Sequence, residues 1–550
     1  MFEIYDYQNP ESRVRSARFL GEYARAYRAE ADEKWALFYA YYRGEHRTAA
    51  QIAQSCEAAG IPWIAAQSPD PYFQVEAQIN AELPDFEFRG RDDDLDSIRA
   101  RQREFVVRYI LERNRVADQA AVDDRRCLIT GTSAWKVFWD STLGPDGDIR
   151  VVSIDPRCLY PDPAAKTLED CEYLQYVYPM HRRSFARAYA GEIARLKLEA
   201  GDFQNSADLL TPPDAQTYQA GDDTVEVMEH WYRDCDGDVC CSIQAGGYEL
   251  RHIEKYWRAA SAGCNAFPFV IRYRTANPDG FWGTGDLEPI LTLVDAVDRE
   301  LSIAQLSSAF TGSDIILAEH DAFSEEPENR PGAIWRLKPG ASGKISRLGG
   351  LGNNANRLEM SNTLRSLISE TLGTLDINHG LVSTNFSSAS ALQQLIERSE
   401  SRSSAKKQER LGAYARLFRL IDWTALEFYD HDRVIFLGAG DDGREKPLVF
   451  TFNAENLRTP QGYFPEIDTI IGTGERRRRG NSFELAAIEA ILAHGISREN
   501  YPLVLQVVRM FDLEASNTLE AHFRQVFKDT PQEKPLAGEE KTSDSEEITI

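Results

Sequence analysis

The sequence lacks long apolar runs. No segment of the 550-residue chain comes near the run of about eighteen consecutive apolar residues that a membrane-spanning helix needs. The N-terminal segment MFEIYDYQNPESR also lacks the charged, then apolar, then small-residue order of a signal peptide. We therefore expect a chain without membrane contact that is made and kept in the cytoplasm, or in an assembly built there.

Sequence motifs of common enzymes are absent as well. The closest string to a phosphate-binding loop, Gly340 to Ile345 (GASGKI), lacks a first glycine at the right distance and a hydroxyl after Lys344. There is no Gly-x-Ser-x-Gly and no His-Glu-x-x-His motif, and the nine histidines stand apart. Carboxylate pairs such as Asp441 and Asp442 are expected by chance among 87 acidic residues, so they are weak evidence for a metal-dependent nuclease. The sequence thus predicts no enzyme and no cofactor.

The eight cysteines show no disulfide framework, so we expect reduced and mostly buried thiols. Cys235, Cys240 and Cys241, taken with His230 and His252, do not have the spacing of a common zinc ribbon. Adjacent Cys240 and Cys241 in a strand would also point to opposite faces. The sequence therefore predicts no metal site.

The net charge of -25 argues against a protein that wraps nucleic acid with a basic face, because affinity for phosphate comes from clustered Lys and Arg. It does not exclude a surface that DNA slides past. The chief basic patch is Arg476, Arg477, Arg478 and Arg479. It could form salt bridges between subunits, contact DNA, or be an idle solvated turn.

The length predicts roughly two to four structural regions, and 42% apolar residues give ample material for cores. The first, residues 1–283, has the pattern of an α+β region. Helices are expected at 11–58, 71–83, 97–114, 117–130 and 182–198, and strands at 132–139, 148–154, 225–233, 239–244 and 248–257. An aromatic stripe on the first helix is expected to pack inside the protein: Phe19, Tyr23, Tyr27, Trp35, Phe38 and Tyr41.

Two helices bracket a short β-rich insert in the next part of the chain. The first helix, 284–309, carries an apolar seam with steps of three and four: Leu287, Ile290, Val294, Val297, Leu301 and Ala304. We expect Asp286 to cap this helix and Pro289 to lie in its first turn. The insert, 310–354, has strands expected at 314–319, 332–337 and 344–348. The second helix, 355–373, carries Leu358, Leu364, Leu367, Ile368 and Leu372.

A Gly/Ser/Asn-rich loop, 374–388, leads into a long helix and strands, 389–468. The middle of this helix, Glu397 to Arg410, has almost no apolar residue, so it must bridge elements, line a wet space or touch a neighbour. A hairpin is expected at 434–437 and 448–452, and helices are expected within 469–528. The acidic segment 529–550 has no core-forming run and should be disordered.

Four stretches, in this order, resemble the portal, or head-to-tail connector, proteins of tailed bacteriophages. The resemblance covers roughly residues 30 to 500. The stretches are Ala40 to Arg47 (AYYRGEHR), Val152 to Pro163 (VSIDPRCLYPDP) with the segment Tyr173 to Tyr189 after it, Phe267 to Pro289 (FPFVIRYRTANPDGFWGTGDLEP) and Ser387 to Arg402 (SSASALQQLIERSESR).

The resemblance implies an α+β, helix-rich portal fold that assembles into a ring, usually a dodecamer, around a central channel. Its wing would comprise 1–283 and 389–468, its stem helices 284–309 and 355–373, its clip 310–354, its tunnel loop 374–388 and its crown 469–528. The polar tunnel-loop residues suited to weak contacts with a DNA backbone are Asn378, His379, Ser383, Thr384, Asn385 and Ser387. In the stem, some of Asp295, Asp298 and Arg299 are expected to face the channel or a neighbouring subunit.

Such a ring lies at one capsid vertex of the virion, and the implied partners follow from that place. They are double-stranded DNA, the terminase large subunit that drives packaging, head-completion or adaptor and tail proteins, and the major capsid and scaffolding proteins. The protein itself would be a conduit for packaging, retention and ejection. Two alternatives stay open on the residues alone: a metal-dependent nuclease, and a scaffold or adaptor without a channel.

Overall fold

The computed structural model describes residues 5–47, 83–91, 94–144, 146–198, 224–258, 265–311, 315–319, 322–324, 336–348, 354–372, 389–436, 449–459 and 462–472. The chain divides into two compact units, residues 1–471 and 472–550, and the description below concerns the first. None of its described helices is long and apolar enough to cross a membrane.

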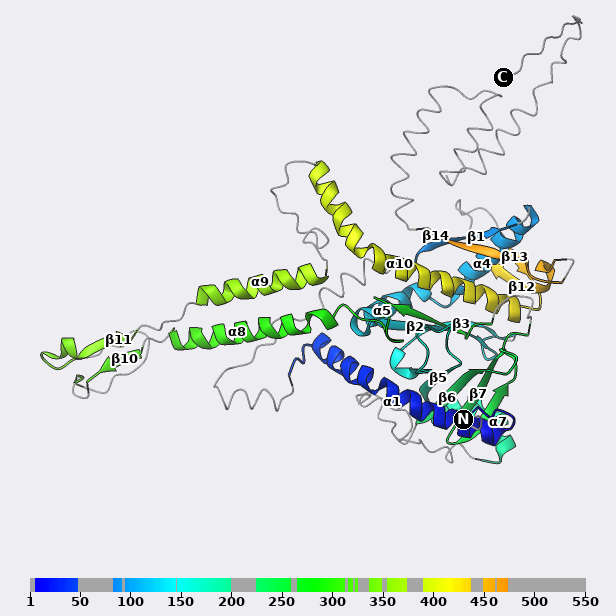
Figure 1. Cartoon of the computed structure of the whole chain (residues 1–550), viewed down its shortest axis with the longest axis horizontal. Helices are drawn as coiled ribbons and strands as arrows, with labels where there is room; N and C mark the ends of the chain where they lie inside the picture. The colour runs from blue at the N-terminus through cyan, green and yellow to red at the C-terminus, as the bar shows by residue number, and fades with distance from the viewer. Residues whose placement is uncertain are drawn as a thin grey trace, which may run out of the picture. The chain divides into compact units, whose positions relative to one another are not determined.

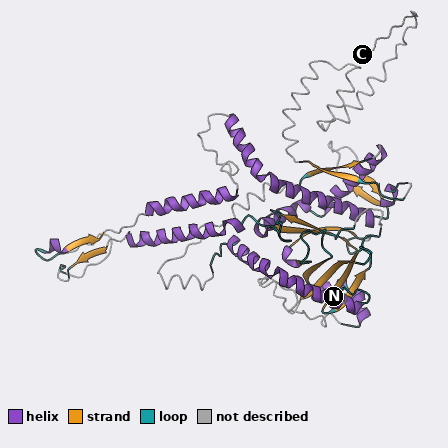
Figure 2. Cartoon of the chain, in the orientation of Figure 1, coloured by secondary structure: helices purple, strands orange, loops and turns teal. Residues whose placement is uncertain are grey.

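The described elements mix helices with short antiparallel sheets, so the α+β fold class is confirmed (Figures 1 and 2). The helices are α1 (Pro10–Tyr42), α4 (Asp94–Arg113), α5 (Val116–Thr130), α6 (Arg182–Ala188), α7 (Ala190–Leu196), α8 (Leu291–Thr311), α9 (Asn354–Leu372) and α10 (Ala389–Phe428). Short 3-10 turns are η1 (Pro156–Cys158), η4 (Glu288–Ile290), η5 (Ala341–Lys344) and η7 (Ala454–Leu457).

The strands form two larger sheets and three pairs. They are β1 (Asp85–Gly90), β2 (Thr132–Asp140), β3 (Asp148–Ile154), β4 (Leu159–Pro161), β5 (Tyr173–His181), β6 (Thr224–Arg233), β7 (Val239–Ala245), β8 (Tyr248–Ile253), β9 (Phe269–Tyr273), β10 (Ile315–Ala318), β11 (Ile345–Leu348), β12 (Arg433–Phe436), β13 (Val449–Phe452) and β14 (Ile467–Gly472). The sheet orders are β3-β2-β9, β4-β5-β6-β7-β8, β1-β14, β10-β11 and β12-β13.

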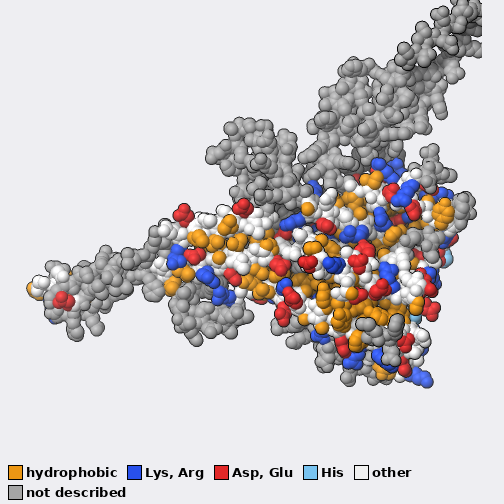
Figure 3. All heavy atoms as spheres, in the orientation of Figure 1, with side chains coloured by type: hydrophobic (Ala, Val, Ile, Leu, Met, Phe, Trp, Pro, Cys, Tyr) orange, Lys and Arg blue, Asp and Glu red, His pale blue; other side chains and the backbone are white. Residues whose placement is uncertain are grey.

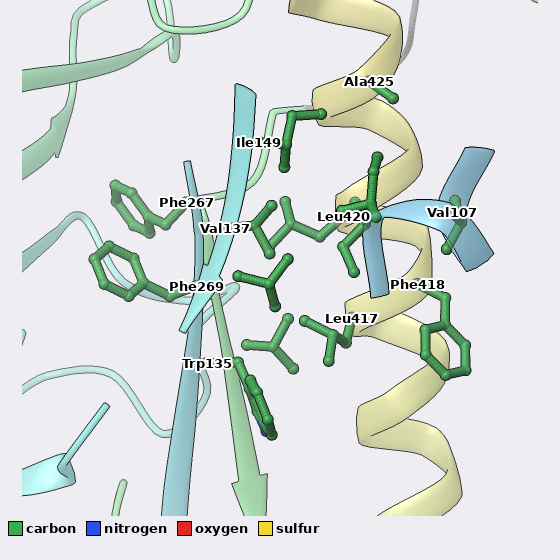
Figure 4. Close-up of a cluster of buried hydrophobic side chains, with 14 of the residues drawn as sticks. Val107, Trp135, Val137, Ile149, Phe267, Phe269, Leu417, Phe418, Leu420 and Ala425 are labelled. Carbon is green, nitrogen blue, oxygen red and sulfur yellow. The ribbon is translucent and has the colours of Figure 1, made fainter. Parts of the chain in front are cut away.

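The main core lies between the sheet β3-β2-β9 and the C-terminal part of α10. Trp135 and Val137 of β2 and Ile149 of β3 face Leu417 and Leu420 of α10, as Figure 4 shows. All five side chains are almost wholly buried. Burying an aliphatic side chain of this size stabilises the fold by about 1.5–3 kcal/mol, so this layer fixes the C-terminal part of α10 on the sheet.

Polar side chains complete the open edge of this sheet. The carboxamide of Asn114 donates to the Ile149 carbonyl (3.0 Å) and accepts from the Val151 amide (3.1 Å). The carboxamide of Gln119 donates to the Val151 carbonyl (3.2 Å) and accepts from the Ser153 amide (2.9 Å). Two side chains thus take the place of a further strand beside β3 and satisfy its backbone groups.

The edge of the five-stranded sheet is closed in a comparable way by Arg28 of α1. This guanidinium is buried, pairs with Asp32, and lies 3.7 Å from the centre of the Tyr160 ring. It donates to the carbonyls of Arg157 and Leu159, at 2.6 Å each. At this edge the carbonyls of Leu159 in β4 and of Arg157 in the turn η1 before it are therefore both paired.

Helix α1 lies on the five-stranded sheet through a close approach at Gly21. A methyl group there would come within 2.5 Å of Oε1 of Gln175 on β5. The Gln175 amide donates to the Ala17 carbonyl (2.6 Å) and lies 3.2 Å from Nδ1 of His230. Nδ1 of His230 must therefore accept, which leaves the ring proton on Nε2, 3.4 Å from the Tyr7 hydroxyl. Burial lowers the pKa of His230 to about 3, so the ring is neutral.

The two adjacent cysteines of β7 point to opposite faces, as predicted. Cys240 packs with Leu20 and Ala24 of α1, whereas Cys241 belongs to the main core with Trp231. Burial raises the pKa of Cys240 to about 12. Both thiols are free and buried, so they behave as small apolar side chains.

A buried ion pair joins the two sheets. Lys136 of β2 donates to both carboxylate oxygens of Glu229 on β6, at 2.6 and 2.7 Å. The ammonium also lies within 4.6 to 6.0 Å of four aromatic ring centres, those of Phe138, Tyr176, Tyr178 and Phe269. Trp231 Nε1 donates to Glu229 as well (3.0 Å), so the charge on each partner is compensated within the described core.

The predicted aromatic stripe of α1 is only half correct. Trp35, Phe38 and Tyr41 are buried, but Phe19, Tyr23 and Tyr27 are 51%, 58% and 42% exposed. The helix also ends at Tyr42, short of the predicted residue 58; residues 48–58 lie outside the described residues. The sequence pattern could not distinguish the buried from the exposed aromatic residues. A spacing of three or four residues shows that side chains share one face of a helix, but it does not show which part of that face another element covers.

Other boundaries differ from the predictions for local reasons. Residues 173–181 form strand β5, which is not among the strands that the sequence analysis predicts. The helix predicted over 182–198 is two short helices separated at Tyr189. Of the three strands expected in the insert, β10 and β11 pair with each other, and Leu337 makes only an isolated bridge with Phe323.

Candidate functional site: the helical hairpin and its root

Helices α8 and α9 pack against each other as an antiparallel pair, which we call the helical hairpin. The seam residues Leu287, Ile290, Val294 and Val297 form one cluster with Leu364 and Ile368 of α9. Farther along α8, Glu300 pairs with Arg357 of α9 (3.0 Å). The predicted apolar seam of the first helix is thus confirmed. Trp35, Phe38 and Tyr41 join the same cluster, so the end of α1 supports the hairpin.

The three charged residues predicted beside this seam lie in different environments. Asp295 is partly buried and accepts from the Tyr41 hydroxyl (2.7 Å). Asp298 is wholly buried against Nδ1 of His46, whose ring stacks on Tyr41. Arg299 is exposed. Burial and the Asp295 hydrogen bond raise the pKa of Tyr41, so its hydroxyl stays a donor. The stretch Ala40 to Arg47 therefore fastens α1 onto α8.

Helix α9 carries three large apolar side chains that the chain itself does not cover, Met360 and Leu367 on one flank of the helix and Leu358 on the opposite flank. Leu358 and Met360 are each 50% exposed, and Leu367 is 42% exposed. Of the apolar residues noted in this helix, Leu364 and Ile368 are therefore buried, whereas Leu358 and Leu367 are not covered within one chain. Figure 3 shows hydrophobic side chains along the visible face of the hairpin. An apolar helix face of this kind is typical of a surface that packs against another protein.

Three glycines bring backbones into contact where the hairpin begins, a place that we call the hairpin root. Gly131 ends α5 with φ +79°, and a methyl group on it would meet the Gly283 carbonyl oxygen at 2.2 Å. A methyl group on Gly285 would meet the carbonyl oxygens of Ile129 and Leu128 at 2.7 and 2.8 Å. The segment Gly283 to Gly285 is thus pressed onto the end of α5, a contact that only glycine allows.

Asp286 lies in this root and does not cap the helix, contrary to the prediction. Its Oδ2 accepts from Nε and Nη2 of Arg274, just past β9 (3.0 and 2.7 Å), and its Oδ1 accepts from Lys406 of α10 (2.7 Å). The 3-10 turn η4 begins after Leu287 without a side-chain cap, and Pro289 lies in it as expected. Burial would raise the pKa of Asp286, but the two cations outweigh it and hold that pKa below its usual value.

A second buried cluster of charges lies beside the first. Arg272 of β9 contacts Asp124 and lies 3.1 Å from Asp123, both on α5, and Nε of Arg410 lies 3.4 Å from Asp124. Ser133 donates to Asp123 (3.0 Å). Burial and the adjacent Asp124 raise the pKa of Asp123 above its usual value, although Arg272 opposes this. The polar middle of α10 thus bridges elements, one of the three options that the sequence left open.

The other predicted site residues lie outside the described residues. These are the loop residues Asn378, His379, Ser383, Thr384, Asn385 and Ser387, and the basic run Arg476, Arg477, Arg478 and Arg479. Sequence reasoning missed the roles of Lys406 and Arg410. The available signal was their spacing of four residues, which places both cations on the same face of the helix. Within the described parts of the chain, no group of His, Cys, Asp or Glu could hold a metal ion.

These features define a class of protein before any comparison is made. The hairpin offers an apolar face for association, and its root is built from packing and ion pairs. The described residues fit a protein that associates with other proteins through a helix surface.

Comparison with protein families agrees with this class. Residues 20–262 match the model of the family described as Phage P22-like portal protein. The match confirms, over these residues, the resemblance to tailed-phage portal proteins. No curated protein matches the chain.

Proposed function

We propose that the chain is a phage portal protein. It forms a ring, a dodecamer by family resemblance, at one capsid vertex, and double-stranded DNA passes through the ring during packaging and ejection. The match of residues 20–262 to the portal family carries this proposal. The helical hairpin supports it, because α8 and α9 would serve as the two stem helices. The inserted strands β10 and β11 would then belong to the clip. The three-stranded sheet β3-β2-β9 and the five-stranded sheet β4-β5-β6-β7-β8 would belong to the wing.

In such a ring, the apolar face of α9 would be covered by the neighbouring subunit. Met360 and Leu367 are seven residues apart, which places them on one side of the helix. Arg299 would be the one residue of the predicted stem set that is free to face the channel or a neighbour, since Asp298 is engaged with His46 and Asp295 with Tyr41. DNA would be held by shape and weak contacts, because strong contacts to every phosphate would stall it.

The partners proposed for the ring are the terminase large subunit, adaptor and tail proteins, and the capsid and scaffolding proteins. Terminase would supply the ATP hydrolysis, which fits the absence of a phosphate-binding loop in the sequence. The tunnel loop 374–388 would contact the DNA, and the crown 469–528 would hold the basic run Arg476 to Arg479. Assembly would take place in the host cytoplasm, and the mature protein would be part of the virion.

Negative-stain electron microscopy of the purified full chain tests the proposal. We expect rings with a central channel wide enough for duplex DNA. Replacing Met360 and Leu367 with Asp should abolish the rings, because the charges would be buried between subunits. Val434→Asp, on a 69% exposed side chain of β12, is the matched control and should leave the rings intact. Monomers of the wild-type chain at high concentration would refute the ring.

The alternative of a metal-dependent nuclease has no support in the described part of the chain, where no carboxylates converge on a metal site. A cleavage assay with DNA and Mg²⁺ decides it independently of the ring. A scaffold without a channel would give assemblies in the microscope that lack a central opening.

A further inference from the structure

The segment that precedes helix α1, residues 5–8, contacts the five-stranded sheet through a single side chain. The ring of Tyr7 stacks on Tyr232 of β6, with 3.8 Å between the ring centres and 18° between the planes. The Tyr7 hydroxyl lies 3.4 Å from Nε2 of His230. Among the described residues, every hydrogen bond and ring contact from residues 5–8 to the sheet comes from Tyr7.

The surface under the Tyr7 ring is set by the register of two strands. Tyr173 of β5 lies opposite Tyr232 of β6, and Gln175 lies opposite His230. Residues two apart on a strand share a face, so these four side chains lie on one face of the sheet, which α1 covers. All four are buried. Because burial lowers the pKa of His230 to about 3, none of them is charged.

These groups fit one kind of side chain, a phenol. The ring of Tyr232 offers a flat face for stacking, and the proton on Nε2 of His230 faces an oxygen that can accept it. Burial raises the pKa of Tyr7, so its hydroxyl stays neutral. A charged group at this place would lose its hydration and find no opposite charge on these side chains. The surface therefore favours a neutral aromatic ring that carries an oxygen.

Helix α1 begins and stays on the sheet without residues 5–8. Its first turn is closed by a capping box, in which the Ser12 amide donates to Oδ1 of Asn9 (2.8 Å) and the Asn9 amide donates to Oγ of Ser12 (3.2 Å). The buried guanidinium of Arg13 makes two hydrogen bonds of 2.7 Å to Glu249 of β8. One turn farther on, Leu20 packs on the sheet. The helix is thus capped and docked by residues 9 onward.

Separation of residues 5–8 from the helix breaks few bonds. Oγ of Ser16 donates to the Asp6 carbonyl (3.1 Å), and Nη1 of Arg13 donates to the Tyr7 carbonyl (2.9 Å). Once the segment is in solvent, water hydrates both carbonyls. Arg13 keeps its two hydrogen bonds to Glu249, and the Ser16 hydroxyl can turn to a carbonyl one turn back in its own helix. No buried charge is left without its partner.

We propose that residues 5–8 form a removable plug, and that Tyr7 of this plug occupies a phenol-binding site made by Tyr232 and His230. The plug leaves the sheet while α1 stays in place. The uncovered site then binds another phenol ring, the side chain of a tyrosine. This inference concerns a single chain and does not depend on the ring.

Thermal unfolding of full-length Tyr7→Ala with p-cresol, the tyrosine side chain as a free molecule, tests the site. Loss of a partly buried ring should lower the unfolding midpoint by about 4–8 °C. For a ligand of this size with a Kd of about 1 mM, p-cresol at about 10 mM should raise the midpoint of the variant by about 3 °C. Tyr5→Ala is the matched control, because Tyr5 is in the same segment and 52% exposed. Its midpoint should equal that of wild type, with or without p-cresol. A shift in Tyr7→Ala no larger than that in Tyr5→Ala would overturn the site.

Hydrogen–deuterium exchange of Tyr7→Ala tests whether α1 stays in place. Exchange of the amides in residues 17–42 should remain within about twofold of wild type. A rise on the order of tenfold there would mean that the helix leaves with the segment, and the removable plug would be refuted. If Tyr7→Ala does not have the circular dichroism spectrum of wild type, Tyr7→Leu replaces it in both experiments. Leucine fills part of the site but cannot stack on Tyr232, so p-cresol should shift its midpoint in the same direction by about half as much. The absence of that shift would overturn the site.

Discussion

Gly285→Ala adds one methyl group to the hairpin root and is expected to destabilise the fold. The new Cβ would lie 2.7, 2.8 and 2.9 Å from three backbone atoms: the Ile129 oxygen, the Leu128 oxygen and the Gly131 nitrogen. All three belong to the end of α5, so no side-chain rotation relieves the contact. The segment must move away by several tenths of an ångström.

The movement has a second cost, because the next amide, that of Asp286, donates to the Leu128 carbonyl at 3.0 Å. Overpacking costs about 1–3 kcal/mol and a weakened hydrogen bond about 0.5–1.5 kcal/mol, so the free energy of unfolding should fall by about 2–4 kcal/mol. At about 2 °C per kcal/mol for a large domain, the midpoint should fall by about 4–8 °C.

Thermal unfolding followed by circular dichroism measures this loss. Gly191→Ala is the matched control, because a methyl group at that position in α7 meets no atom within 4 Å. It should leave the midpoint unchanged or raise it slightly. If Gly285→Ala and Gly191→Ala unfold at the same temperature, the close contact of backbones at the root does not exist as described.

Three further outcomes are expected. The folded pKa of Asp286 lies below its usual value, so the stability from its ion pairs is fully present above pH of about 4 and is lost as the pH falls through the folded pKa. The free energy of unfolding should therefore differ between wild type and Asp286→Asn by a constant amount from pH 8 to 5. This difference should shrink in more acid solution. Lys136→Met should cost about 3–5 kcal/mol by stranding Glu229, and adding Glu229→Gln should restore most of it in denaturant titrations; no restoration would contradict the pairing. Gly21→Ala should lower the unfolding midpoint, since the clash with Gln175 outweighs the gain in helix propensity, and a raised midpoint would contradict the contact.

Much of the local structure follows directly from sequence patterns. The strands at 132–139 and 148–154 alternate and end at turns, and the structure places β2 and β3 within one residue of these bounds. The seam of α8 was readable because its apolar residues recur every three or four positions, and a helix must bury such a stripe. These are short-range properties, and local propensity and periodicity determine them.

The contacts of the root were not readable in the same way. Asp286 has the residue type and position of a helix cap, but two cations from distant segments bind it instead. Leu358 and Phe19 satisfy helical periodicity and yet stay exposed, because periodicity cannot tell an internal partner from another molecule. The glycines at 131 and 285 approach each other across the fold, and this pairing is invisible until the topology is known.

The side chains that complete the sheet edges have a consequence for assembly. In an oligomer, many copies of one chain are held at very high local concentration, and two open edges would readily join by backbone pairing. Asn114 and Gln119 occupy the edge of β3, and Arg28 occupies that of β4, so these edges offer a neighbouring copy no strand-pairing site at those positions. At these positions a neighbouring copy would have to be recognised through side chains and not through backbone pairing.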